Sequence, residues 1–373
     1  MKGFDKFVAY TVQVPERESQ KGGFAELACD ASQFPKLADM LETAVRNLPS
    51  GDPHATQWTR QGFSVPNPHE EPVIIVDEVL GEQKDVPYVI ADENEKFIWL
   101  VFEERARMLS PATIKDALAE VEEEYFERHE EHMTKRERND ARDKIIADLL
   151  PKAPIKRTRT NVMIIEGVVI VFAGSRNIGD KVTSALRKCL GSLPVMDWFE
   201  APDFVNMFLK KIAKSDYDLE TPVGKARADF ELVGNAKLKL ESGDYTFKGV
   251  EDITSDESFT TALEMSDGMH PYGLIEGHLH LTATGTDRPL AFTLSNKGAI
   301  KGVKWVGEDE ESEFDPSEYD EAEERESAML RFNAWNGYTS AFLILKSLYL
   351  AAANRFEDEA GDWNVTNYEE DDI

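Results

Sequence analysis

The sequence predicts an α+β fold in which antiparallel strands alternate with helices. Three observations predict it: segments with the two-residue alternation of half-buried strands, segments with apolar residues at helical spacing, and no βαβ glycine fingerprint between them. The 373 residues are enough for two or three domains with a substantial core. The hydrophobic content of 41% is ordinary for a globular chain, and no apolar run is long enough to predict a membrane span.

The first hundred residues have the pattern of a strand, a helix and two more strands. Alternation predicts the first strand over 6–14, and apolar residues at helical spacing predict a helix over 32–48. The segments 73–79 (VIIVDEV) and 97–102 (FIWLVF) are typical of strands in a half-buried antiparallel sheet. We therefore expect an N-terminal α+β domain over residues 1–109.

Residues 110–150 are predicted to be helical. Ser110 and Pro111 supply an N-cap and a first-turn proline. Apolar residues are sparse along the segment, which is typical of an extended, solvated helical arm, with a break expected near 133–135. We assign the arm and its tip to residues 110–160.

The remaining residues predict a second α+β domain over 161–306 and a final helix. A hairpin turning near Glu166 and Gly167 is followed by a helix that ends at Gly191. The expected elements are the hairpin 162–173, the helix 180–190 and strands within 230–248, 274–281, 289–294 and 301–306. An apolar helix over 330–356, in a segment 329–356, has a surface wide enough for either the core or a subunit interface.

Charge is distributed unevenly along the chain, whose net charge is −29. Residues 307–328 hold 12 acids and one base, and residues 356–373 hold 8 acids and no base, which predicts an acidic linker (307–328) and an acidic tail (357–373). Between Lys135 and Lys188, by contrast, 13 Lys and Arg face 6 Asp and Glu, a balance of +7. A positive block within an acidic chain indicates an anionic partner.

The candidate DNA-binding residues fall into two sets. The first lies on and after the predicted arm, where positions 135, 138 and 142 share one helical stripe: Lys135, Arg136, Arg138, Arg142, Lys152, Lys156, Arg157 and Arg159. The second is scattered: Lys210, Lys211, Lys237, Lys239 and Lys248. Each cation that meets a phosphate would give binding that ignores sequence and weakens with salt. Composition alone equally allows a solvated helical face balanced by neighbouring acids.

The residues do not predict an enzyme. His278 and His280, with Glu276, share one strand face, but two histidines without a convincing third ligand are more often surface residues. Phosphate-loop and Ser or Cys nucleophile motifs are absent. Cys29 and Cys189 lack metal spacing and are interpreted as reduced thiols. We therefore assign no catalytic residue, no metal and no cofactor.

The order of motifs over residues 111–195 resembles the recombination-associated RdgC family. The matching residues are Ile114-Lys115-Asp116-Ala117-Leu118, Leu149-Leu150-Pro151 and Leu186-Arg187-Lys188-Cys189-Leu190-Gly191-Ser192-Leu193-Pro194-Val195. Further matches are Gly62-Phe63, Ala228-Asp229-Phe230-Glu231-Leu232 and Asp252-Ile253-Thr254-Ser255. The resemblance implies an RdgC-like fold that assembles as a ring-shaped homodimer around duplex DNA.

Two departures from the family pattern concern the ring. In the family, a DNA contact precedes a short motif that reads Asp252-Ile253-Thr254 in this chain. The nearest cation before the motif is Lys248, and Glu251 stands where the family has a pair of basic and polar residues. A phenylalanine that seals one subunit contact follows the Leu-Leu-Pro motif in relatives, whereas this chain offers Pro154, Ile155 and Lys156. The dimer interface is therefore expected at these three residues, with Ile155 as its apolar side chain.

The resemblance implies a non-enzymatic, sequence-independent double-stranded DNA-binding protein that inhibits RecA-type recombination by competing for DNA. The expected setting is cytoplasmic and nucleoid-associated, with no membrane partner. Two alternatives stay open: an acidic protein-binding module or DNA mimic on the same fold, favoured by the charge of −29, and a metal-dependent exonuclease.

Overall fold

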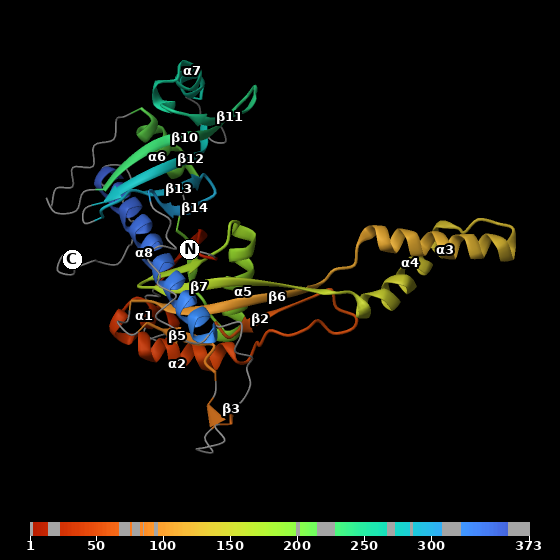
Figure 1. Ribbon diagram of the computed structural model, residues 1–373. Coiled ribbons are helices and arrows are strands. Elements are labelled where there is room, and N and C mark those ends of the chain that lie inside the picture. The colour runs from red at the N-terminus through yellow and green to blue at the C-terminus, as the bar shows by residue number, and fades with distance from the viewer. Residues whose placement is uncertain are drawn as a thin grey trace.

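The computed structural model describes residues 3–13, 23–66, 75–76, 83–84, 86–92, 96–198, 202–214, 228–266, 273–283, 286–307 and 322–356. One long antiparallel sheet carries helices on its faces, and a two-helix arm projects from one end of it (Figure 1). This α+β architecture confirms the predicted fold class. In the described residues, no helix is long and apolar enough to cross a membrane.

The main sheet has twelve strands in the order β11-β10-β12-β13-β14-β1-β8-β7-β6-β2, with β5 on β6 and β9 on β1. Their bounds are β1 (Lys6–Val12), β2 (Thr59–Ser64), β5 (Val89–Ala91), β6 (Ile98–Arg107), β7 (Ile155–Ile165), β8 (Val168–Val171), β9 (Val195–Asp197), β10 (Ala228–Leu240), β11 (Gly243–Val250), β12 (Gly273–Ala283), β13 (Leu290–Ser295) and β14 (Ile300–Trp305). Strand β1 joins the two halves, because Phe7 pairs with Ile300 of β14 while Val8 pairs with Val171 of β8.

The helices are α1 (Phe24–Ala28), α2 (Phe34–Val45), α3 (Pro111–His129), α4 (Lys135–Leu149), α5 (Arg176–Leu190), α6 (Pro202–Ala213), α7 (Glu257–Met265) and α8 (Ala322–Phe356), with 3-10 turns η2 (Ala31–Gln33), η3 (Leu150–Lys152) and η4 (Ile253–Ser255). Helices α1, α2 and α5 pack on one face of the sheet through Leu37, Leu41 and Leu186. Helices α6, α7 and α8 pack on the opposite face.

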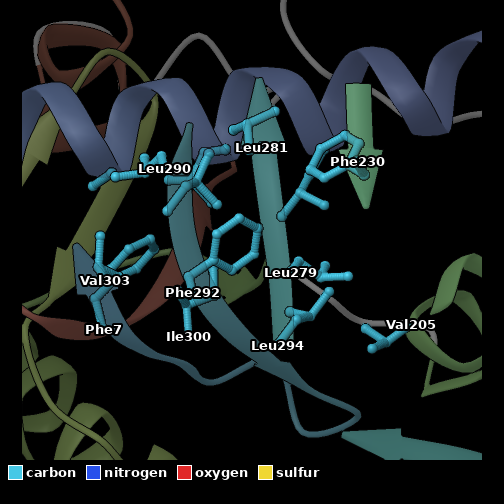
Figure 2. Close-up of a cluster of buried hydrophobic side chains, with 14 of the residues drawn as sticks. Phe7, Val205, Phe230, Leu279, Leu281, Leu290, Phe292, Leu294, Ile300 and Val303 are labelled. Atoms are coloured by element: carbon cyan, nitrogen blue, oxygen red, sulfur yellow. The ribbon is translucent and has the colours of Figure 1, made fainter. Parts of the chain in front are cut away.

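The larger core lies between α8 and the sheet. Figure 2 shows Phe230, Leu281 and Leu290 against α8, with Phe292 and Ile300 deeper among the strands. Ile344 and Leu348 of α8 are fully buried in this cluster. Each such side chain contributes about 1.5–3 kcal/mol by leaving water. The apolar C-terminal helix therefore belongs to the core of the fold, one of the two roles that its sequence allowed.

Most predicted elements are confirmed. The arm breaks between His129 and Lys135, next to the expected position, and Gly167, with φ of 69°, turns the predicted β7–β8 hairpin. Helix α5 ends at Gly191, whose φ of 76° suits a residue without a Cβ. The short α1 and the helices α6 and α7 were not predicted from the sequence.

The predicted strand over 73–79 is wrong as a member of the main sheet. Of the segment 73–79, the structure describes only Ile75–Val76. These two residues form strand β3, which pairs with Gln83–Lys84 (β4) in a separate two-stranded sheet. Strand β6 pairs with β7 on one side and with β2 and β5 on the other. Strand β2 lies at the end of the sheet's order, and its polar first residues (TRQ) hid it from a hydrophobicity pattern.

The predicted acidic segments are only partly visible. Residues 308–321 of the linker and the whole tail 357–373 lie outside the described residues. Residues 322–328, assigned to the linker from their acidity, form the first two turns of α8 instead. The division of the chain into domains stays a prediction, while the main sheet runs continuously from β11 to β2.

Candidate nucleic-acid interface

The arm is a helical hairpin held by local interactions at its helix ends. The Ser110 hydroxyl accepts a hydrogen bond from the Thr113 amide at 3.0 Å, which confirms the predicted cap of α3. At the start of α4, the Thr134 hydroxyl and the Glu137 carboxylate satisfy each other's backbone amides in a capping box. The carboxylate of Glu137 also accepts a hydrogen bond from the Tyr125 hydroxyl at 3.1 Å. These contacts set how α4 turns back along α3.

The predicted basic stripe of the arm is exposed on α4. Lys135, Arg136 and Arg142 are exposed and form no ion pair among the described residues. Arg138, on the same stripe, is paired with Glu122 of α3 at 2.5 Å. Three of the four predicted arm cations are thus available to an anionic partner, and one is balanced by the neighbouring helix.

The arm is joined to the body by Arg107, the last residue of β6. Its guanidinium donates hydrogen bonds to the carbonyls of Pro53, Leu150 and Pro151 at 2.9, 3.2 and 2.8 Å. These carbonyls come from the loop before β2 and from the turn that ends the arm. The side chain therefore ties both ends of the arm to the sheet.

The basic residues after the arm have different environments. Lys152 and Lys156 are exposed, as is Arg157, and none of them has an ion pair among the described residues. Arg159 is half-buried, and its guanidinium donates to the carbonyls of Val65 and Pro66 at 2.5 and 2.8 Å. Burial lowers the pKa of Arg159. Arg159 thus holds the chain that follows β2, while the other three present their charge to solvent.

Two arginines next to this segment, Arg60 and Arg105, were not predicted as site residues from the sequence. The strand register places Arg60 of β2 opposite Arg105 of β6, and Arg105 opposite Arg157 of β7. We call these three residues the arginine row. A period-two signal was visible in Glu103-Arg105-Arg107, but the row exists only once the register of three strands is known.

A small acidic network lies beside the arginine row. The Arg105 guanidinium pairs with Glu103, which is 2% exposed, and donates to Asp52 at 2.7 Å. The hydrogen bond from Arg105 lowers the pKa of Asp52, so this carboxylate stays charged. Glu103 also lies 3.5 Å from the Arg159 guanidinium. Asp52 and Glu103 therefore neutralise Arg105, the middle residue of the arginine row, and Glu103 also lies close to Arg159.

The second predicted set of lysines is divided between the two faces of the sheet. Lys210 and Lys211 are on α6, which packs on the α8 face. Lys237 and Lys239 alternate with the buried Leu238, so they point to the other side of β10, away from α6, α7 and α8. Lys237 is paired there with Asp244 at 3.2 Å. The structure therefore does not bring these four lysines together.

The predicted family contact before Asp252-Ile253-Thr254 lies at the end of β11. Lys248 and Glu251 are both exposed, and Asp252 caps the η4 turn by accepting a hydrogen bond from the Ser255 amide at 3.2 Å. Gly249 between them has φ of 64°, a conformation that favours glycine. The acid at Glu251 thus stands on the same exposed turn as the cation.

His278 and His280 lie on the side of β12 that points away from α8. The ring nitrogen Nδ1 of His278 is 3.0 Å from the Thr293 hydroxyl, and its ring centre is 5.9 Å from that of His280. Burial lowers the pKa of His278, and His280 and Lys304 lower it further. Across the described ranges, no group of three or more His, Cys, Asp or Glu is arranged to hold a metal ion.

Comparison with known proteins shows similarity to one family. A family model described as "Putative exonuclease, RdgC" matches residues 38–208. The protein named "Recombination-associated protein RdgC" of Pseudomonas aeruginosa strain LESB58 is 26% identical over 272 residues, which cover 72% of this chain and 78% of the relative. That of Shewanella baltica strain OS185 is 27% identical over 294 residues, 76% and 84% of the two chains. The chain is similar to the RdgC proteins over most of its length.

The RdgC match confirms the resemblance identified in the sequence. The matched residues 38–208 include the whole arm and all three members of the arginine row. Strands β10 to β14, with Lys237, Lys239 and Lys248, lie beyond the family model. The family model is described as an exonuclease, whereas the relatives are named for an association with recombination.

Proposed function

We propose that this RdgC-like chain is a non-enzymatic protein of DNA recombination that binds double-stranded DNA without reading its sequence. The observation that carries the proposal is the exposed trio Lys152, Lys156 and Arg157 at the root of the arm, none of which forms an ion pair among the described residues. An acidic chain that keeps such cations unpaired has a surface suited to phosphates. The names of its RdgC relatives support the role in recombination.

The proposed contacts are electrostatic. Each cation that meets a phosphate displaces a condensed counterion, so affinity falls steeply with salt and depends little on base sequence. The exposed Lys135, Arg136 and Arg142 extend the same charge along the arm. Arg138 and Lys237 contribute less, because Glu122 and Asp244 already balance them.

We further propose that two copies form a ring around the duplex, with one contact at Pro154, Ile155 and Lys156. Pro154 and Lys156 are exposed and Ile155 is partly exposed, so all three are available to a second chain. A ring that occupies duplex DNA would obstruct a RecA-like recombinase, and this action fits a cytoplasmic, nucleoid-associated protein. The arm, which projects away from the body, supplies the reach that such a closure needs (Figure 1).

Salt-dependent binding tests the proposal. We expect the purified protein to bind linear and closed circular duplex at low salt without metal, and to leave linear duplex more readily by way of its ends. The double variant Lys156→Ala/Arg157→Ala should lower the salt slope by about two, one counterion per lost phosphate contact. Lys36→Ala, an exposed lysine of α2, is the matched control. An unchanged slope in the double variant would remove this surface from the proposal.

The same experiment separates the two alternatives. A net charge of −29 favours a DNA mimic or acidic protein-binding module, which would not bind duplex even at low salt. The description of the matching family model favours an exonuclease, which would shorten labelled duplex ends once magnesium or manganese is added. Intact, salt-sensitive binding with and without metal is the result expected of the proposed function.

A further inference from the structure

The arginine row places like charges directly opposite each other. In the antiparallel register, Arg60, Arg105 and Arg157 are cross-strand neighbours on adjacent strands. Side chains at such positions are about 5 Å apart at their Cβ atoms, where like charges repel. A row of this kind needs anions nearby to be favourable.

The protein's own carboxylates neutralise only the middle of the row. Arg105 is paired with Glu103 and Asp52. Arg60 and Arg157 form no ion pair among the described residues, although Arg157 still lowers the pKa of Asp52 through space, after the larger effect of Arg105. The guanidinium of Arg60 lies over Gly51, where even a Cβ would approach it within 3.0 Å. Arg157 is exposed and Arg60 is partly exposed, so a ligand can reach both outer residues of the row.

The row is held in a fixed frame. Arg107 and Arg159, which flank it on the same face of β6 and β7, are hydrogen-bonded to backbone carbonyls through their guanidinium groups. Their contacts fix the strand ends without using the row itself. The cations of the row are therefore presented from a rigid sheet surface and not from a loop.

An exposed tryptophan adjoins the row. Trp58 is 43% exposed, and its carbonyl accepts a hydrogen bond from the Arg107 amide at 2.8 Å. This bond continues the β2–β6 register by one residue, and strand alternation then places Trp58 on the same face as Arg60. The exposed indole leaves apolar surface in contact with water, and it lies next to guanidinium groups that no carboxylate neutralises among the described residues. Such a pair suits unpaired nucleotides, because a base can stack on the ring while phosphates contact the cations.

We propose that the arginine row and Trp58 form a site for an unpaired stretch of nucleic acid, with phosphates on Arg60 and Arg157 and one base stacked on Trp58. The site rests on the proposed function in one respect, that the rest of the protein holds the adjoining duplex. The bases inside a duplex are already stacked on each other, so Trp58 is used only where a strand is unpaired. The protein then prefers a duplex that carries a single-stranded tail over a blunt duplex.

The test compares blunt duplex, tailed duplex and oligo-dT at one salt concentration. Wild type is expected to bind tailed duplex about tenfold more tightly than blunt duplex, the size that one stacked base supplies. Trp58→Ala should abolish this preference and leave blunt-duplex affinity unchanged. Tyr245→Ala, which removes an aromatic side chain of equal exposure (43%) from β11, should keep the preference.

Two further experiments keep the proposal falsifiable if Trp58→Ala is poorly folded. Trp58→Phe, a smaller ring, should retain part of the tail preference. In the wild-type protein, 2-aminopurine placed in the tail should be quenched on binding, and the same base placed within the duplex should not. Unchanged tail fluorescence, or a preference that survives in Trp58→Ala, overturns the stacking site.

The charged part of the site has its own control. Arg60→Ala/Arg157→Ala should weaken tailed duplex and oligo-dT more than blunt duplex, whereas Arg60→Lys should keep most of the affinity. Equal losses on all three ligands would show a general phosphate surface and overturn the specificity for unpaired strands. If blunt duplex is not bound at all but oligo-dT is, the proposed function fails while this site stands.

Discussion

The arm and helix α8 are both long helical segments, and they are stabilised by opposite means. Helix α8 has 35 residues and buries Ala341, Ile344 and Leu348 completely. Helix α4 has 15 residues, and none of its side chains is buried. Apart from Ile114 and Leu118 of α3 and Leu150, which are buried, the arm depends on caps, ion pairs and the hydrogen bonds of Arg107, while α8 depends on the apolar surface that it shares with the sheet.

This difference teaches where the molecule can change without unfolding. Local contacts are worth fractions of a kilocalorie to a few kilocalories per mole, so a helix that has only such contacts opens on its own. A helix buried across the sheet opens only with the core. The surfaces that we propose for DNA include both kinds of support: Lys135, Arg136 and Arg142 lie on α4, which can adjust, while Arg157 lies on a strand of the sheet, which the core keeps rigid.

Leu348→Ala is expected to give the largest effect, because it removes a fully buried side chain of α8. The free energy of unfolding should fall by about 2–5 kcal/mol, measured by chemical denaturation. Arg142→Ala on the exposed face of α4 is the control and should change it by less than about 0.5 kcal/mol. Similar losses for the two variants would end the distinction between α8 and the arm.

Arg107→Ala should have a smaller, local effect. It removes three hydrogen bonds to the carbonyls at the arm root, which together are worth about 1–3 kcal/mol. Hydrogen exchange should accelerate in residues 108–110 and 150–154 while the amides of β7 and β8 stay protected. Arg128→Ala, which breaks an exposed ion pair with Glu124, should leave the arm root unchanged. Faster exchange throughout the sheet would instead mean that Arg107 supports the whole fold.

Thr134→Ala should affect only the start of α4. The loss of the capping hydroxyl costs a helix about 0.5–2 kcal/mol, so the first turn of α4 should exchange faster. Thr134→Ser keeps the hydroxyl and should behave like wild type. The transition of the body on heating should not move in either variant, and a clear shift would show that the arm is coupled to the core.

The smallest expected effect is a pH dependence at His278. The folded protein lowers the pKa of His278 below its ordinary value of 6.5, so the unfolded chain takes up the proton at higher pH. The resulting stability is present above pH 6.5 and is lost as pH falls through the lower folded pKa. The melting temperature at pH 7.5 and 5.5 should therefore differ more in wild type than in His278→Gln. An equal difference in both proteins would assign the pH dependence to other groups.

The sequence predicted the elements whose cause is local. The arm was predicted from Ser110, Pro111 and the sparse apolar positions of 110–150, because caps and helical spacing depend on residues that are close in sequence. Leu330 to Phe356 predicted a helix for the same reason, but only the structure shows that it covers a sheet. The role of Arg159 could not be predicted, since its carbonyl partners, Val65 and Pro66, lie more than 90 positions away.

The candidate site was predicted in part. The charge block found Lys152, Lys156 and Arg157, because their charges are adjacent in sequence. Arg60 lies in no basic run, and its place beside Arg157 is set by β6 between them. The strand predicted over 73–79 was misplaced for a related reason, since an apolar run indicates a strand without naming its partner.

The position of β1 has a consequence for how the chain reaches its native state. Phe7 pairs with Ile300, which lies most of the described chain away, and from the next residue, Val8, onward the same strand pairs with β8. Pairings between such distant residues form late, because the closing of a long loop has to precede the contact that rewards it. During synthesis on the ribosome, β1 can pair with β8 before the second half of the chain has been made. The first residues of β1 then stay unpaired at the edge of the sheet until β14 is available. The two halves of the sheet are thus joined last, by the segment that was synthesised first.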